Sequence, residues 1–134
     1  MKTINRISLL PMMAFLALTF TFCQGQTGSQ KLTADAFEKK LSSTSAKIIL
    51  DVRTPEEYAD GHLANSTLVN FYDSDFKQQI NKLDKSKPVF VYCKGGVRSA
   101  KAAQALTEAG FKEVYDLQGG YDSWAGAKKP TTRQ

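Results

Sequence analysis

The stretch KPVFVYCKGGVRSAKAAQAL, residues 87–106, decides the fold that this sequence predicts. Val89–Tyr92 is a short run of β-branched and aromatic residues, which is typical of a buried strand. Cys93 follows, then a turn with two glycines, and then an alanine-rich pattern that predicts a helix over residues 98–109. This order brings one sulfur atom to the backbone N–H groups of a turn and a helix N-terminus.

The loop CKGGVRS, residues 93–99, has the composition of an anion-binding site. Its two glycines can turn consecutive N–H groups inward, and the following helix adds its unpaired N–H groups and the positive end of its dipole. Two basic side chains add formal charge, and such surroundings favour a thiolate over a thiol. The loop therefore predicts Cys93 as a nucleophile that needs no histidine base; an inert buried thiol is the alternative.

Strands and helices alternate along the rest of the chain. Further strands are expected over residues 47–52, 67–71 and 113–117, and further helices over 34–41, 56–59, 74–83 and 121–125. This alternation predicts an α/β fold with a mostly parallel sheet and helices on both faces. Ligands of such sheets bind at the carboxyl ends of the strands, and Cys93 follows one of those ends.

The N-terminal segment is expected to be an export signal over residues 1–25, because a basic start precedes an apolar run over residues 9–22. Cys23 suggests a lipoprotein signal in which that cysteine carries the lipid, whereas cleavage after Gly25 is the competing possibility, and both stay open. An uncleaved anchoring helix is the third alternative. The expected product is exported to the periplasm or cell envelope, with membrane contact only through a lipid at Cys23. A polar linker is expected over residues 26–30, one domain over 31–129 and a frayed tail over 130–134.

Composition limits the other classes of ligand. The 134 residues carry a formal charge of +5, but no basic stripe has interleaved aromatic residues, so no nucleic-acid partner is expected. The two cysteines and the single histidine, His62, do not cluster, which predicts neither a metal site nor a disulfide framework.

Three segments in register make a family resemblance specific: DVRTPEEYADGHLANS at residues 51–66, CKGGVRS at 93–99 and LQGGYDSW at 117–124. In these segments the chain resembles the single-domain rhodaneses, which are thiosulfate sulfurtransferases, over residues 31–129. The resemblance implies a sheet of about five parallel strands and no cofactor. It also implies that Cys93 takes the outer sulfur of thiosulfate, holds it as a persulfide and passes it to cyanide or a thiol in ping-pong fashion.

The resemblance implies that the loop binds the substrate around Cys93 through Lys94, Gly95, Gly96, Val97, Arg98 and Ser99. Its backbone N–H groups would stabilise the outer persulfide sulfur. Lys94 and Arg98 would attract a small anionic donor, with Arg98 forming a bidentate contact to its oxygens, while Ser99 would either bond the sulfur or cap the helix.

Residues outside the loop are expected to be structural. Asp51 and Arg53 would pair at a strand end, and Glu57 would cap or pair locally. His62 would pack a loop, and Trp124 would lie in the core or wall the pocket.

Two other functions stay open. Phosphatases and arsenate reductases also place an arginine after a cysteine loop, but four residues separate Cys93 from Arg98 here, whereas the related phosphatases have five. The longer ring suits a tetrahedral oxyanion, and the shorter one suits a single sulfur atom. A non-catalytic module that carries sulfur or binds a partner is the other alternative.

Overall fold

The sheet of this protein is wholly parallel and has five strands in the order β1-β5-β4-β2-β3. The computed structural model describes residues 28–133; the predicted signal segment and Cys23 lie outside them. The strands are β1 (Gly28–Leu32), β2 (Ile48–Asp51), β3 (Thr67–Leu68), β4 (Val89–Tyr92) and β5 (Glu113–Leu117). The helices are α1 (Ala34–Ser43), α2 (Pro55–Asp60), α3 (Phe76–Asn81), α4 (Val97–Glu108) and α5 (Gly120–Gly126).

Strand β4 is the middle strand of the sheet, between β5 and β2. All four of its residues are buried, because helices cover both faces of the sheet. This explains why the strand reads as an unbroken apolar run rather than as an alternating one. It also places Cys93 at the centre of the carboxyl edge of the sheet.

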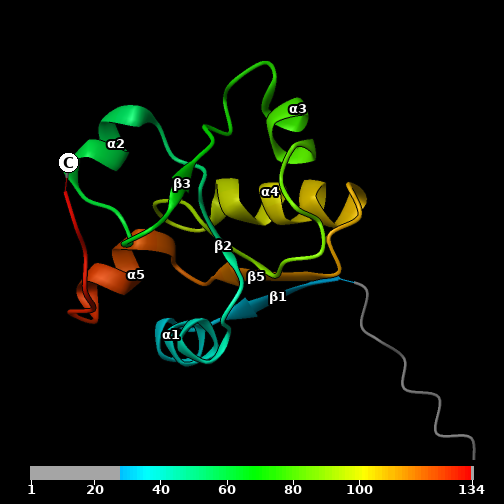
Figure 1. Ribbon diagram of the computed structural model, residues 1–134. Coiled ribbons are helices and arrows are strands. Elements are labelled where there is room, and N and C mark those ends of the chain that lie inside the picture. Colours follow the sequence, from blue (N-terminus) through cyan, green and yellow to red (C-terminus); the bar gives the residue numbers. More distant parts are fainter. Residues whose placement is uncertain (1–27, 134) are drawn as a thin grey trace, which may run out of the picture.

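Two apolar clusters fill the space between the sheet and its helices. On one face, α1 and α5 bury Phe37 and Trp124 against β4 and β5. On the other face, α3 and α4 bury Phe76, Ile80 and Leu106. Figure 1 shows the two pairs of helices on opposite sides of the sheet. The expected α/β architecture, with helices on both faces, is therefore confirmed.

The N-terminal boundary of the domain differs from the prediction. Residues 28–30, expected in a polar linker, belong to β1, which pairs with β5 from Gly28 opposite Glu113 to Leu32 opposite Leu117. The sequence GSQKL has no apolar run that would mark a strand, because β1 lies at an edge of the sheet and most of its side chains are exposed. Backbone hydrogen bonds to β5 hold it there.

The C-terminal tail, expected to fray from residue 130, is tied down as far as Thr132. The indole Nε1 of Trp124 donates to the carbonyl of Pro130 at 2.8 Å. Thr132 and His62 exchange backbone hydrogen bonds of 2.8 and 2.9 Å. His62, the partner of Thr132, lies far away in the sequence, so the residues of the tail do not indicate this contact.

Two smaller differences lie between β3 and α3. The strand expected over residues 67–71 is only Thr67–Leu68, although Val69 and Phe71 still donate backbone hydrogen bonds to the β2 end. Helix α3 begins at Phe76, and its N-cap residue Asp75 makes no side-chain capping bond. Among residues 28–133, no helix has the length and apolar character needed to cross a membrane.

Candidate active site

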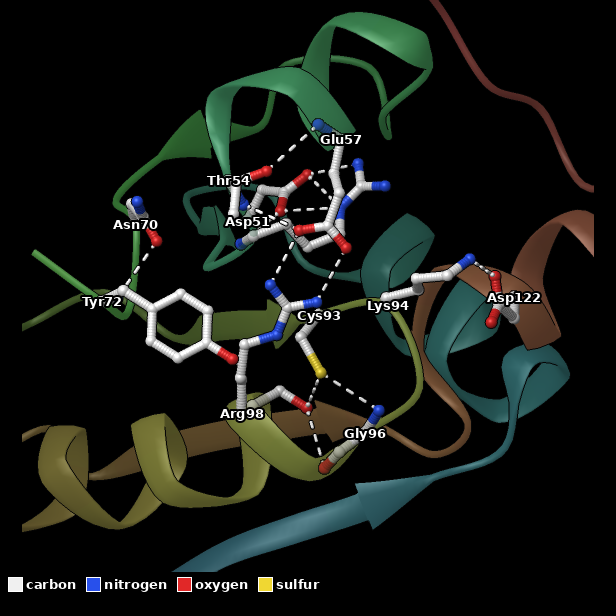
Figure 2. Close-up of polar contacts among 12 residues, drawn as sticks. Asp51, Thr54, Glu57, Asn70, Tyr72, Cys93, Lys94, Gly96, Arg98 and Asp122 are labelled. Atoms are coloured by element: carbon white, nitrogen blue, oxygen red, sulfur yellow. Dashed lines mark hydrogen bonds and ion pairs between the residues drawn. The ribbon is translucent and has the colours of Figure 1, made fainter.

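The sulfur of Cys93 lies directly beyond β4 and is nearly enclosed, with 1% of the residue exposed. The backbone N–H of Gly96 donates to Sγ over 3.0 Å, and the thiol donates to Oγ of Ser99 over 3.5 Å. Figure 2 shows the sulfur pointing at the Gly96 nitrogen, at the start of α4. One of the predicted loop amides, that of Gly96 at the start of α4, is thus brought to the thiol.

Gly96 is the N-cap residue of α4 and has φ of 106°. That backbone conformation is easily reached only by glycine, and it turns the Gly96 N–H toward the sulfur. The neighbouring loop residues Lys94, Gly95 and Val97 are exposed, Val97 to 71%. All three lie in the loop beside Cys93, as predicted.

Helix α5 holds the outer side of the cysteine loop. The N–H groups of Tyr121 and Asp122 donate to the carbonyls of Cys93 and Lys94 at 2.7 and 3.0 Å. These two hydrogen bonds fix the start of the loop against α5, while the Gly96 N–H faces the sulfur. The local sequence of residues 117–124 does not indicate this contact with the cysteine loop.

The approach of α5 to the loop depends on Gly120, which has φ of 61°. A Cβ atom at this position would lie 2.5 Å from the carbonyl oxygen of Cys93 and would also collide with the carbonyl of Lys94. Glycine is therefore required here both by backbone conformation and by space. The paired glycines in LQGGYDSW were the visible sign of this contact, but they do not say which loop they meet.

Arg98 is already bound within the protein. Its guanidinium makes a bidentate ion pair with Glu57, with N–O distances of 2.7 and 2.8 Å, visible in Figure 2. These hydrogen bonds lower the pKa of Glu57 to about 2 and raise the pKa of Arg98. The predicted bidentate contact to donor oxygens is thus occupied by a carboxylate, because α2 places Glu57 opposite the start of α4.

Glu57 has a second task at the start of α2. Its carboxylate accepts from the backbone N–H of Thr54 at 2.9 Å, and the Thr54 hydroxyl accepts from the N–H of Glu57. This capping box agrees with the local role predicted for Glu57. The ion pair with Arg98, which is 41 positions away, could not be predicted from the local sequence.

The second basic residue of the loop, Lys94, also has an acidic partner. Its Nζ lies 2.9 Å from a carboxylate oxygen of Asp122, and both side chains are more than half exposed. An exposed pair of this kind contributes little to stability and yields readily to a competing anion. Lys94 is therefore the more accessible of the two cations predicted to attract a donor.

Ser99 lies inside α4, is fully buried and contacts the sulfur. It does not cap the helix, since Gly96 occupies the N-cap position. Of the two predicted roles, the contact with sulfur is the one observed.

The residues expected to support the site do so. Arg53, 2% exposed, binds the carboxylate of Asp51 at 2.7 Å and the carbonyl of Gly61 at 2.6 Å. It also lies 4.3 Å from the ring of Tyr121, so it links the end of β2 to α5. His62 stacks on Tyr58 and packs its loop, as predicted.

Trp124 belongs to the cluster under α1 and α5, on the face of the sheet opposite α4. It does not wall the thiol. Within residues 28–133, no three His, Cys, Asp or Glu side chains gather closely enough to hold a metal ion.

A strand that ends in an enclosed cysteine, with a turn and a helix N-terminus around its sulfur, can be compared with known proteins. The family model for the rhodanese-like domain matches residues 33–127. The chain belongs to the rhodanese-like domain family.

The sequence is similar to those of several named proteins. The chain is 42% identical over 85 residues to "Thiosulfate sulfurtransferase GlpE" of Coxiella burnetii, and the match covers 63% of this chain and 77% of that protein. It is 41% identical over 81 residues to "Uncharacterized protein YqhL" of Bacillus subtilis, covering 60% of this chain but only 63% of that protein. It is 40% identical over 84 residues to "tRNA uridine(34) hydroxylase" of Pelagibacter ubique, covering 60% of this chain and 27% of that protein.

Solved structures agree with the rhodanese fold. A rhodanese-related protein from Thermoplasma volcanium has a TM-score of 0.69 and 28% identity, covering 78% of this chain and 99% of that one. The resemblance expected from the three sequence segments is therefore confirmed for family and fold. Relatives named as sulfurtransferases occur among its matches, next to relatives with other names.

Proposed function

We propose that this rhodanese-like protein is a sulfurtransferase that moves a sulfane sulfur from thiosulfate or a similar small anionic donor to a thiol or cyanide. The observation that carries the proposal is the 3.0 Å hydrogen bond from the Gly96 N–H to the Cys93 sulfur, inside a loop whose outer carbonyls are bound by α5. A main-chain donor aimed at sulfur favours its anionic form. The 42% identity to a protein named thiosulfate sulfurtransferase also supports it.

The proposed reaction has two steps. The Cys93 thiolate attacks the outer sulfur of thiosulfate, a new S–S bond forms, and the old S–S bond breaks with its electron pair leaving on sulfite. The persulfide anion then stays on Cys93, where the loop N–H groups stabilise its negative charge. An acceptor thiolate or cyanide attacks the outer sulfur, which restores the Cys93 thiolate and releases a persulfide or thiocyanate.

The cations of the loop have separate tasks in this proposal. Lys94, exposed and weakly paired, attracts the anionic donor. Arg98, held by Glu57 at one side, keeps a positive charge beside the thiol. Ser99 supplies a hydroxyl next to the sulfur.

The intact mass of the purified chain after thiosulfate treatment tests the proposal. Gain of one sulfur atom, mapped by peptide analysis to Cys93 rather than Cys23 and absent in Cys93→Ser, is the expected result. Thiocyanate should then form when cyanide is added. An aryl phosphate is offered in parallel, and phosphate release without sulfur uptake would favour the phosphatase alternative. Physiological activity that persists in Cys93→Ser would mean that the thiol is not needed and would favour the non-catalytic module.

We also propose that the protein acts after export, in the periplasm or cell envelope, since residues 1–25 have the pattern of an export signal. The mass of the mature protein tests this. A product that begins at Cys23 and carries a lipid supports the lipoprotein form, and one that begins at Gln26 supports cleavage after Gly25. An intact N-terminus would contradict both.

A further inference from the structure

A groove lies between α4 and the segment that leads from β3 into α3. Its volume is about 360 Å³, which is enough for a small organic ligand. Phe71, Phe76 and Ala105 supply its apolar lining, and polar side chains stand around them. Figure 1 shows α3 and α4 on the same side of the sheet. The proposed reaction uses no residue of this groove.

On the α4 side, the groove begins one helical turn away from the catalytic loop. Arg98 and Lys101 lie three positions apart in α4, so their side chains are neighbours on one face of the helix. Ala105 lies four positions further along and lines the groove together with Lys101. Arg98 interacts with Cys93 through its charge. A ligand that reaches Cys93 beside Arg98 can therefore extend along α4 into the groove.

On the other side, three aromatic rings connect the active site with the groove. The Tyr72 ring lies 5.6 Å from the Arg98 guanidinium, and Figure 2 shows it beside that side chain. Phe71 meets Tyr72 edge-on with ring centroids 6.0 Å apart, and Phe76 lies 5.2 Å from Phe71. Tyr72 is 68% exposed and is the only exposed aromatic ring among residues 28–133. It offers an apolar surface to the body of a substrate at the entrance to the groove.

The charges of the groove fit a single carboxylate. Lys77 and Lys101 line the groove, and neither has an acidic partner within 4 Å among residues 28–133. Glu108 and Asp73 also line it, and each accepts a hydrogen bond from a glutamine side chain, at 3.0 and 3.3 Å. An anionic group near the two lysines is attracted, whereas a second one would approach these carboxylates. The rest of the ligand is therefore expected to be uncharged.

We propose that this groove binds the body of the sulfur acceptor, and that the acceptor is a small thiol with a peptide-like body that ends in one carboxylate. The inference rests on the proposed sulfur transfer through Cys93. Three residues of extended chain span about 10 Å, which is about two turns of α4, the separation of Arg98 from Ala105. An acceptor of this length places its thiol near Cys93 and its carboxylate between Lys77 and Lys101.

The groove adds no chemical step to the transfer. The acceptor thiolate attacks the outer sulfur of the Cys93 persulfide and forms a new S–S bond. The S–S bond to Cys93 breaks, and its electron pair returns to the Cys93 sulfur as a thiolate. The acceptor leaves as a persulfide.

Two matched acceptors test the inference on the full chain, with thiosulfate as the donor. One is acetyl-Cys-Ala-Ala with a free carboxylate, and the other is the same peptide with a terminal amide. The two differ only at the end remote from the thiol, so a difference in rate reports on the carboxylate. We expect kcat/KM to be several-fold higher for the acid at low salt, and the two values to converge in 1 M salt.

Three variants locate the effect. Lys77→Gln combined with Lys101→Gln should abolish the preference for the acid and leave the rate with cyanide unchanged. Lys82→Gln is the matched control, because this exposed lysine at the end of α3 does not line the groove. Ala105→Met fills the groove and should raise the KM of both peptides, but not that of cyanide. Circular dichroism confirms that each variant is folded.

Equal values of kcat/KM for the acid and the amide in the wild type would overturn the inference. A preference that survives in the double lysine variant would also overturn it. Sulfur transfer to cyanide and both peptides without such a preference refutes the groove alone. Absence of sulfur transfer to all three acceptors refutes the proposed function and the groove with it.

Discussion

The ion pair between Glu57 and Arg98 makes a quantitative prediction for Glu57→Gln. Glutamine can still accept the Thr54 N–H bond of the capping box, so the substitution mainly removes the charge opposite Arg98. A pKa lowered from 4.5 to about 2 corresponds to about 3 kcal/mol of stability. The Glu57 side chain is 26% exposed, and solvent screens the pair, so about 1–2 kcal/mol is expected at pH 7.

The contribution of Glu57 to the free energy of unfolding depends on pH. The pKa of Glu57 is lower in the folded protein than in the unfolded chain, so its contribution is fully present above pH 4.5 and is lost as the pH falls toward 2. Urea unfolding of both proteins at pH 7, 4 and 3 measures the difference. The difference in the free energy of unfolding between the wild type and Glu57→Gln should become smaller as the pH falls. A gap of equal size at pH 7 and pH 3 would refute the reasoning.

The same variant has an effect at the active site. Removing the Glu57 charge leaves Arg98 without its carboxylate partner. Arg98 interacts with Cys93 through its charge, so it can then stabilise the thiolate more strongly. Cys93 should therefore react with iodoacetamide several-fold faster at pH 6, and the KM for thiosulfate should fall. Thr54→Val, which removes the cap but keeps the ion pair, is the control and should leave the alkylation rate unchanged.

Three further predictions concern the scaffold. Gly120→Ala should slow both alkylation and sulfur uptake more than tenfold, because its Cβ displaces the cysteine loop, whereas Gly126→Ala, with nothing within 4 Å, should leave both unchanged. Arg53→Met strands the buried Asp51 carboxylate and should lower the free energy of unfolding by about 3–5 kcal/mol in urea titrations. Asp116 on β5 is a buried carboxyl whose Oδ1 has no hydrogen-bond partner among residues 28–133, so Asp116→Asn should raise the free energy of unfolding by about 1–3 kcal/mol at pH 7. Burial raises that carboxyl's pKa, so the gain should vanish below its ordinary value of 3.8; thermal unfolding at pH 7 and pH 3 measures it.

The sequence was informative where the structure is local or repeats a simple period. The apolar run Val89–Tyr92 predicts a strand covered on both faces, and it is the central strand of the sheet. The loop glycines and the helix after them predict the surroundings of Cys93, because a few consecutive residues build that turn. The pairing of Asp51 with Arg53 was equally accessible, since the two lie at one strand end.

Edge strands and contacts between distant residues could not be predicted from the sequence in this way. The polar strand Gly28–Leu32 exists because β5 offers it backbone hydrogen bonds, and its own side chains carry no apolar signal. The tail residue Thr132 is ordered by His62 for the same reason. An element that is stabilised by its neighbour leaves little trace in its own residues.

The sequence alone determined which atom reacts and what surrounds it, because a nucleophile, a nest of amides and a helix N-terminus follow one another within residues 93–99. Only the tertiary structure decided which charges that atom meets. Helix α2 brings Glu57 to Arg98 at the start of α4, and α5 brings Asp122 to Lys94. Electrostatic interactions depend on distance through space, and that distance is set by packing rather than by position along the chain.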